Sequence, residues 1–252
     1  MKLIIEKSVV VVTPTIGSPK LADAVESVQK QTYGNLEHLV VVDGYDYEND
    51  TNKAFRSAWQ RFPEGSLKSA RAMIVPYNTG ANGFNGQRIY ASIPHLLNAD
   101  YVFFLDEDNW YEPDHVKTLV SKIEEENLDW AYSLRKAYTP DKQYIADDNC
   151  ESLGKWPIYF THNDPQYLID TSTFAFKRQF IKATCHLWHS GAWGEDRRFF
   201  YAIKDKSKWN TTGKHTLCYR VDNNPNSVNE EFFVKGNAEQ LAHYKGQLPW
   251  LI

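Results

Sequence analysis

Short apolar, β-rich runs alternate with segments of helical spacing along the first 105 residues. The runs are Ser8–Val12, Glu37–Val42, Ala72–Pro76 and Tyr101–Leu105. Between the first two runs, apolar residues recur at the spacing of one helix face, at Leu21, Ala24, Val25 and Val28. Such alternation is typical of a parallel sheet with helices on its faces. We therefore predict an α/β domain with a central, mostly parallel sheet.

The first helix has a readable start. Ser18 can cap its free N–H groups, and Pro19 suits the first helical position, where no donor is needed. We therefore predict that Thr13–Gly17 is a strand-to-helix loop. Such loops lie at the carboxyl edge of the sheet, where open α/β folds bind ligands.

The second half of the chain is less regular. The pattern predicts a helix from Glu112 to about Glu126, strands at Trp130–Leu134 and Phe174–Phe176, a helix at Glu195–Ile203 and a short helical segment near Asn229–Lys235. The stretch Ala137–Gln166 is rich in Pro, Asp, Asn and Tyr and has little periodicity. We expect one domain over residues 1–225, with a regular half (1–110) and a loop-rich half (111–225), and a tail at 226–252.

Charge and length exclude several classes of protein. The 28 Lys and Arg against 32 Asp and Glu give a net charge of −4, which argues against duplex DNA or an anionic membrane as a bulk electrostatic partner. The longest apolar runs are far shorter than the roughly 18 residues of a membrane helix, and residues 1–7 lack the features of a secretory signal. Three widely spaced cysteines predict reduced thiols and a cytoplasmic protein.

Aromatic residues make up 14% of the chain, including 8 Trp and 15 Tyr. They indicate either a large aromatic core or a surface that stacks on flat ligands such as sugars and bases. Composition does not choose between these two interpretations.

The segment Tyr101–Asp108 is an apolar strand that runs into three carboxylates. Residues two apart in an extended chain point the same way, so Asp106 and Asp108 can converge while Glu107 faces elsewhere. Two converging carboxylates favour a hard cation, Mn²⁺ or Mg²⁺, which can bridge a diphosphate. A solvated acidic turn after a strand is an equally good account.

A second acidic pair, Glu195 and Asp196, follows Gly194 at the start of a predicted helix. Acidic residues in a first turn are favoured by the helix dipole, which explains both without a function. The nearby Trp188 and Trp193 favour another interpretation, a general base beside a sugar-stacking platform.

Two further features lie at predicted strand ends. The Gly- and Asn-rich segment Asn78–Arg88 has neither the P-loop nor the dinucleotide spacing, but Arg88 could pair with a phosphate or with an aspartate of the site. A surface salt bridge is its simpler role. Asp43, before Gly44, can accept hydrogen bonds from a nucleobase or ribose, or can simply form an Asp-Gly turn.

A polar, basic segment, Asp205–His215, precedes the predicted strand Thr216–Val221. As a flexible loop it could close over a diphosphate. We retain His215 as an additional candidate metal ligand, although most single histidines ligate nothing.

These features occur in the order found in family-2-type glycosyltransferases of the GT-A fold, which the sequence resembles. The resemblance rests on Val9–Thr15, Ser27–Tyr33, Leu39–Gly44, the Asp-x-Asp motif in Phe103–Asp108 and the Glu-Asp motif in Gly194–Asp196. It is strong over residues 8–115, patchy over 170–225 and absent from 137–166 and after 226. It implies a single GT-A-like, Rossmann-like domain.

The resemblance also implies roles for the donor-side residues. Thr13, Pro14, Thr15 and Asp43 would contact the base and ribose of a nucleotide sugar, most often a uridine diphosphate sugar. Arg88 would support the nucleotide, Asp106 would meet the ribose or the metal, and Asp108 would hold the metal, Mn²⁺ or Mg²⁺.

On the acceptor side, the resemblance implies Asp196 as catalytic base, with Glu195 as runner-up, in an inverting transfer of a hexosyl or N-acetylhexosaminyl group. Trp156, Trp193 and Gly194 would lie near the acceptor. The Gln-x-x-Arg-Trp motif of processive members is missing, so one sugar would be transferred. The acceptor stays open among a glycan, a lipid-linked, a protein or a small-molecule hydroxyl, as does the oligomeric state.

Three alternatives stand beside this interpretation. A non-catalytic nucleotide- or carbohydrate-binding module would bind the donor without consuming it. A sugar-1-phosphate nucleotidylyltransferase would need a Gly-rich N-terminal loop, where Thr13–Gly17 stands instead. A glycosyltransferase acting on modified bases in DNA would need a basic groove, which the net charge disfavours.

Overall fold

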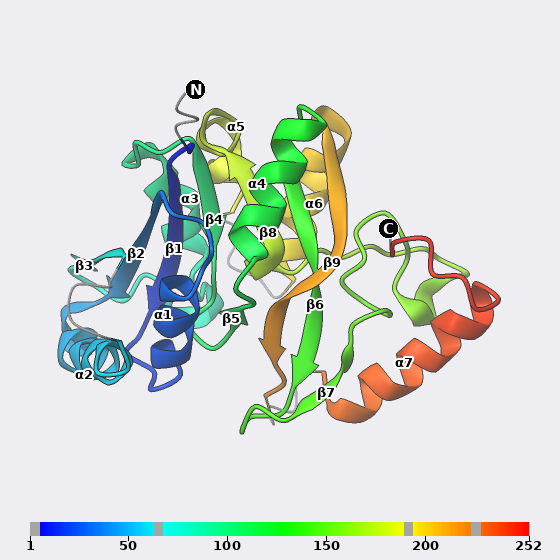
Figure 1. The fold of residues 1–252 in the computed structure, drawn as a ribbon, viewed down its shortest axis with the longest axis horizontal. Coiled ribbons are helices and arrows are strands. Elements are labelled where there is room, and N and C mark those ends of the chain that lie inside the picture. Colours follow the sequence, from blue (N-terminus) through cyan, green and yellow to red (C-terminus); the bar gives the residue numbers. More distant parts are fainter. Residues whose placement is uncertain (1–5, 63–67, 189–193, 223–227, 252) are drawn as a thin grey trace.

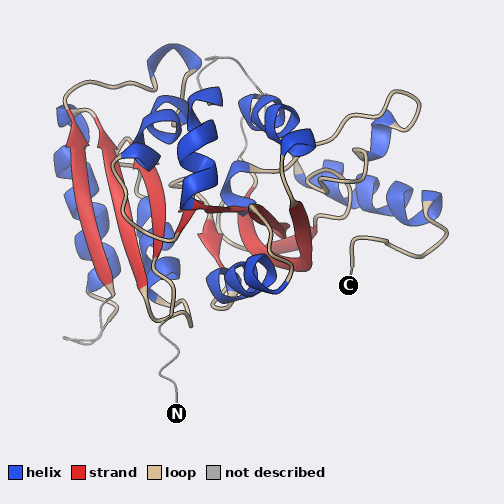
Figure 2. Cartoon of the chain, turned by 90° about the horizontal axis from the view of Figure 1, so that it is seen from above, coloured by secondary structure: helices blue, strands red, loops and turns tan. Residues whose placement is uncertain are grey.

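The computed structural model describes residues 6–62, 68–188, 194–222 and 228–251. Their strands form one nine-stranded sheet with the order β3-β2-β1-β4-β8-β6-β9-β5, and β7 pairs with β6 at its side (Figure 1). Helices cover both faces of the sheet (Figure 2). The predicted α/β class is confirmed.

The N-terminal half is parallel, as predicted. It contains β1 (Val9–Thr15), β2 (Leu36–Asp43), β3 (Ser69–Val75) and β4 (Tyr101–Phe104), connected through α1 (Leu21–Gln29), α2 (Glu48–Trp59) and α3 (Gln87–Ser92). All four strands therefore end at one edge of the sheet, which is where a ligand site of an open α/β fold is expected.

The second half is mixed. β8 (Phe174–Lys177) lies antiparallel between β4 and β6 (Trp130–Tyr138), and β9 (Trp209–Arg220) runs parallel to β6. Two short strands, β5 (Trp110–Tyr111) and β7 (Tyr144–Asp147), pair antiparallel with β9 and β6. The remaining helices are α4 (His115–Glu125), α5 (Arg178–Thr184), α6 (Glu195–Ile203) and α7 (Glu230–His243).

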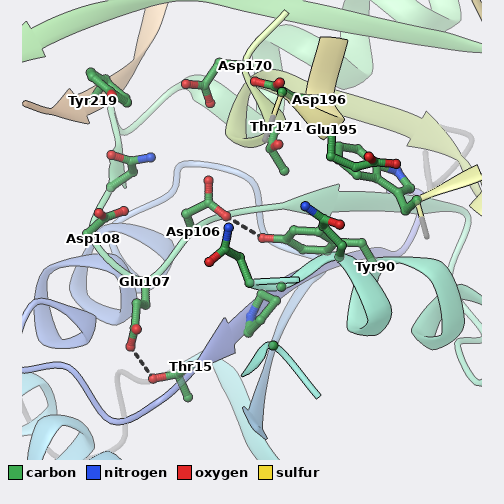
Figure 3. Close-up of a pocket in the computed structure, with 18 of the residues that line it drawn as sticks. Thr15, Tyr90, Asp106, Glu107, Asp108, Asp170, Thr171, Glu195, Asp196 and Tyr219 are labelled. Atoms are coloured by element: carbon green, nitrogen blue, oxygen red, sulfur yellow. Dashed lines mark hydrogen bonds between the residues drawn. The ribbon is translucent and has the colours of Figure 1, made fainter. Parts of the chain in front are cut away.

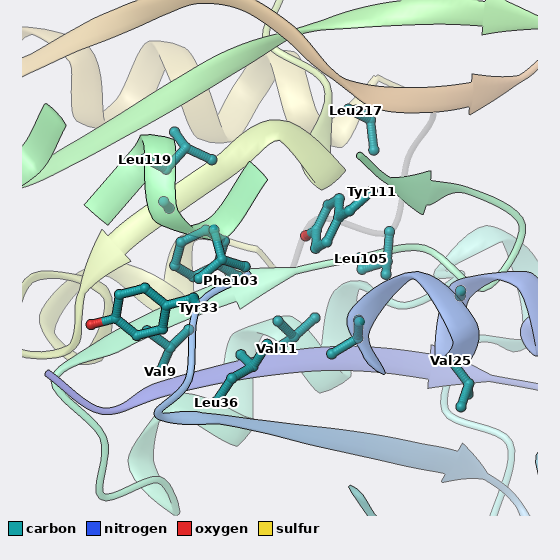
Figure 4. Close-up of a cluster of buried hydrophobic side chains, with 14 of the residues drawn as sticks. Val9, Val11, Val25, Tyr33, Leu36, Phe103, Leu105, Tyr111, Leu119 and Leu217 are labelled. Atoms are coloured by element: carbon teal, nitrogen blue, oxygen red, sulfur yellow. The ribbon is translucent and has the colours of Figure 1, made fainter. Parts of the chain in front are cut away.

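Strand β1 is buried on both faces, which is why its sequence is continuously apolar. Val9 and Val11 face a core formed with α1, α2 and α4, and Figure 4 shows part of this cluster around Phe103. Val10 and Val12 face the opposite core, formed with α3, α5 and α6. The sheet is therefore the middle layer of three.

The aromatic excess belongs mainly to the core. The largest fully buried side chains are Trp130, Trp188, Trp250, Tyr101, Tyr132, Phe103, Phe104, Phe174, Phe176, Phe199, Phe200 and Phe233. Among the described helices, none has the length and apolar character needed to cross a membrane.

The predicted Thr13–Gly17 loop was wrong, since β1 continues to Thr15 and includes Pro14. β1 pairs with β4 only as far as Val12, so the missing N–H of Pro14 lies beyond the end of that ladder. The helix that follows begins at Leu21, and Ser18 Oγ accepts a hydrogen bond from Lys20 N at 3.3 Å.

Two later segments are also more regular than predicted. Residues 209–215 belong to β9 and do not form a loop, because β9 pairs with β6 over its length and accommodates its polar stretch by an irregularity opposite Tyr132 and Leu134. Helix α7 continues past Gly236, where a glycine is expected to weaken it. A Cβ at Gly236 would lie 2.7 Å from Cys150 Sγ, so this glycine permits close packing.

The C-terminal segment packs on the sheet domain. Trp250 is fully buried, its Nε1 donates a 2.8 Å hydrogen bond to Asn149 Oδ1, and its ring lies 5.6 Å from that of Trp156. This contact holds the irregular segment that follows β7.

Candidate active site

A cleft of about 580 Å³ opens at the carboxyl edge of β1, β2 and β4. Thr15, Asp43 and Asp106 line it from the strand ends, and Asp196 lines it from the first turn of α6. Eight carboxylates and two arginines are among its described lining residues. The carboxylates are those of Asp43, Asp106, Glu107, Asp108, Glu151, Asp170, Glu195 and Asp196. Such a site favours cations and hydroxyl-bearing groups.

Asp106 is held from two sides. Tyr90 Oη donates a 2.6 Å hydrogen bond to its Oδ1 (Figure 3). Ser172 Oγ donates a 3.0 Å bond to its Oδ2. Burial, with the charges of Asp170 and Asp108, raises the pKa of Asp106 to about 7 despite these two hydrogen bonds. A cation at this carboxylate would remove much of that repulsion.

Asp108 lies in the same cleft, but the reason differs from the predicted alternation. β4 ends at Phe104, and Asn109 N donates to Asp106 O at 3.2 Å, so residues 106–109 form a turn. Burial raises the pKa of Asp108. The turn, and not an extended chain, brings the two aspartates to one cleft.

Glu107 points toward the β1–α1 connection. Its carboxylate accepts a hydrogen bond from Thr15 Oγ1 (Figure 3). It accepts a second from Ser18 N at 3.1 Å. Burial raises its pKa. Glu107 thereby ties the acidic turn to the end of β1.

Asp43 shapes the Gly- and Asn-rich loop. Its carboxylate is buried and accepts bonds from Thr79 N and Thr79 Oγ1, both at 2.8 Å, and from Gly80 N at 2.7 Å. Arg88 Nη1 donates to Thr79 O at 3.1 Å and the guanidinium lies 3.4 Å over the Phe84 ring, so Arg88 supports this loop without being among the lining residues.

Not every predicted residue reaches the cleft. Pro14 and Thr15 line it, whereas the buried Thr13 lies behind them with Oγ1 2.9 Å from His38 Nε2. His215 Nδ1 lies 3.8 Å from Asp147 Oδ2, and the structure does not bring this ring to the cleft.

The predicted metal site can be compared with the side chains that the structure describes. Over residues 6–62, 68–188, 194–222 and 228–251, no group of three or more His, Cys, Asp or Glu side chains is arranged to hold a metal ion. Of the three predicted metal ligands, Asp106 and Asp108 line the cleft and His215 is not among the lining residues.

Asp196 lies across the cleft from the acidic turn. Arg197 N donates a 2.7 Å hydrogen bond to Asp196 Oδ1. Burial, and then the charge of Asp170, raises the pKa of Asp196 to about 7, which suits a general base. Glu195 is 4% exposed and lies 3.9 Å from Arg198 Nη1.

Of the residues predicted to lie near the acceptor, only Gly194 is found among the described lining residues of the cleft. Gly194 lines the cleft and has φ +77°, the left-handed conformation that favours glycine. Trp193 lies outside the described residues. Trp156 packs on Trp250 and is not among the lining residues, so the structure does not bring it to the cleft.

Sequence reasoning missed the ion-pair network behind the cleft. Arg135 on β6 is 3% exposed, and its guanidinium pairs with Asp148 and Asp170 at 2.7 Å and with Glu151. Glu151 and Asp170 line the cleft beside Asp196. A buried arginine requires acidic partners, so an arginine directly after the predicted strand could have indicated this network from the sequence.

Comparisons with known proteins agree with this fold. The family model described as Glycosyl transferase family 2 matches residues 8–184. "Glycosyltransferase GlyA" of Streptococcus pneumoniae serotype 4 is 30% identical over 131 residues, which are 51% of this chain and 17% of that protein. The chain therefore spans only about a sixth of this curated relative.

Two crystal structures from S. aureus show the same fold. TarS 1-349 has a TM-score of 0.58 at 15% identity, and the match covers 84% of this chain and 60% of that one. TarS 1-349 in complex with UDP-GlcNAc also has a TM-score of 0.58 at 15% identity, with coverage of 86% and 59%.

Proposed function

Since this chain belongs to glycosyl transferase family 2, we propose that it transfers one sugar from a UDP-sugar to an acceptor hydroxyl. The observation that carries this proposal is the placement of Asp43, Asp106 and Asp108 at one sheet edge with Asp196 across the same cleft. The UDP-GlcNAc complex of TarS supports the choice of donor.

The two halves of the cleft suit the two ends of the donor. At the end of β2, Asp43 orders the loop that carries Thr79 and Gly80, so the nucleoside would lie against this rigid edge. The diphosphate would lie beside Asp106 and Asp108, and the sugar between them and Asp196.

Asp106 and Asp108 would hold a divalent cation, Mn²⁺ or Mg²⁺. Their fit rests on donor chemistry, because both present oxygen ligands. Burial, and then the charges of Asp170 and Asp108, raise the pKa of Asp106, and a cation there would offset this effect. A pair of protein carboxylates is enough where substrate phosphates complete the coordination. When bound, the cation would supply positive charge for the departing diphosphate.

Asp196 would act as the base. Its carboxylate accepts the proton of the acceptor hydroxyl while that oxygen forms a bond to the anomeric carbon. The bond from the anomeric carbon to the diphosphate oxygen breaks, and its electron pair leaves with UDP. A single displacement of this kind inverts the anomeric configuration.

The test combines binding and turnover. Thermal unfolding is measured with UDP and UDP-GlcNAc, each with and without Mn²⁺, because a ligand of the folded state raises the melting temperature. UDP release is then followed with glycan, lipid-linked and small-molecule acceptors. Stabilisation together with sugar transfer supports the proposal. Stabilisation without donor consumption indicates a binding module. The absence of both stabilisation and transfer would overturn the proposal.

A further inference from the structure

Trp188 presents a buried hydrogen-bond donor at the cleft. The side chain is 1% exposed and lines the cleft, and its Nε1 has no hydrogen-bond acceptor among the residues that the structure describes. Buried donors of this kind are rare in folded proteins, and each calls for an explanation. An oxygen atom of a ligand is one such partner.

Packing holds the indole in place. Its ring stacks on Phe199 with centroids 4.3 Å apart and lies 5.6 Å from the ring of Tyr90. Tyr90 in turn donates to Asp106, so Trp188 lies one ring away from the carboxylate proposed to face the diphosphate. A group bound near Trp188 would therefore be the part of the donor next to the diphosphate.

The carboxylates that line the same cleft as Trp188 indicate the chemistry of that ligand. Asp106, Asp170 and Asp196 accept hydrogen bonds when ionised, whereas the Trp188 N–H can only donate. A hydroxyl group can do both, because it donates to a carboxylate and accepts from an indole. An ionised phosphate or carboxylate group only accepts hydrogen bonds, so it could not also donate one to these carboxylates. The surroundings therefore fit a neutral, hydroxyl-bearing ring.

We propose that the Trp188 Nε1–H donates a hydrogen bond to an oxygen substituent of the transferred sugar and thereby contributes to the choice of donor sugar. This inference rests on the proposed glycosyl transfer. It assigns Trp188 a contact with the sugar and none with the uridine.

The first experiment uses Trp188→Phe, with Trp130→Phe as a matched control. Both tryptophans belong to the same buried cluster, but Trp130 Nε1 already donates a 2.8 Å bond to Ser207 Oγ. Because Trp188→Phe removes no bond to a described residue, we expect a smaller loss of melting temperature than in Trp130→Phe. The Kd of UDP should stay unchanged in Trp188→Phe, and the Kd of the bound UDP-sugar should rise about fivefold to tenfold.

The second experiment observes the indole directly. The protein is labelled with ¹⁵N-tryptophan, and the Trp188 signal is identified by its loss in Trp188→Phe. UDP, UDP-GlcNAc, UDP-glucose and UDP-galactose are the probes. We expect at least one UDP-sugar to shift this signal and UDP alone to leave it in place.

The outcomes separate the two proposals. Consumption of a UDP-sugar that leaves the Trp188 signal and the Kd of the variant unchanged would overturn this inference but not the glycosyl transfer. A shift without donor consumption would overturn the transfer and retain the sugar contact. If no UDP-sugar shifts the signal, the contact does not exist.

Discussion

Arg135 Nη1 donates a 2.7 Å hydrogen bond to Asp170 Oδ2, and this contact fixes one of the carboxylates that line the cleft. Burial, and after it the charge of Asp170, raises the pKa of both Asp106 and Asp196. A buried arginine on β6 thus positions the group that influences the proposed metal side and the proposed base together.

Replacing Arg135 should destabilise the fold. Arg135→Met leaves Asp148, Glu151 and Asp170 without their cation, and removing one partner of a buried pair costs about 3–5 kcal/mol. Urea unfolding measures the loss. Arg71→Met is the control, since Arg71 is 70% exposed and pairs with Glu37 at the surface, where about 0–1 kcal/mol is expected. Equal losses in both variants would contradict the prediction.

Asp196→Asn should lower the turnover rate by about a hundredfold or more. Binding of UDP should be preserved, because only the proton acceptor is lost. Glu195→Gln provides the comparison with the neighbouring carboxylate. Initial rates of UDP release and the UDP-induced rise in melting temperature are measured for both variants. A normal rate in Asp196→Asn with loss of turnover in Glu195→Gln would move the base to Glu195.

The pH dependence follows from the raised pKa of Asp196. Its carboxyl has a pKa of about 7 in the folded chain against an ordinary value of 3.8. Between these two pH values the folded protein therefore keeps a proton that the unfolded chain has lost. This group therefore lowers the stability as pH rises from about 4 to about 7.

Asp196→Asn should accordingly stabilise the ligand-free protein more at pH 8 than at pH 5, which melting temperatures at the two values can check. In the wild type, kcat/KM should rise with pH up to about 7, because the base must be ionised. A stability gain that is larger at pH 5 would show that the sign is wrong.

Removing Asp108 should abolish the cation-dependent part of donor binding. In Asp108→Ala, the rise in melting temperature that Mn²⁺ adds to UDP should disappear, because one of two oxygen ligands is gone. Asp205→Asn is the control, since its carboxylate is 77% exposed and is not among the lining residues. A shift that persists in Asp108→Ala would place the cation elsewhere.

Much of the first half could be predicted because its signals are local. The apolar runs around Val9, Val40 and Phe103 are buried on both faces of parallel strands, and such burial leaves a continuous pattern in the sequence. Asp43 and Asp106 could be placed at the sheet edge for the same reason, since each follows directly on such a run.

The second half was less predictable because its strands form through pairing with distant segments and not through a local sequence pattern. Residues 209–215 are polar and resemble a loop, yet β6 supplies the partner that makes them a strand. The predicted loop that ended at His215 was therefore wrong, since His215 lies within β9. Gly236 lies inside helix α7, where a glycine weakens a helix, and the close approach of Cys150 and Tyr159 explains this residue.

The sequence by itself determined the α/β class, the order along the chain of the motifs at the ends of the parallel strands, and the family resemblance. These features depend on periodicity and on short motifs. Only the tertiary structure decided which distant side chains meet. Arg135, Asp170 and Trp188 join Asp106 at one cleft across separations that no periodicity encodes. Burial at that cleft then raised the pKa of Asp106 and Asp196, because the energy of a charge depends on its surroundings in space.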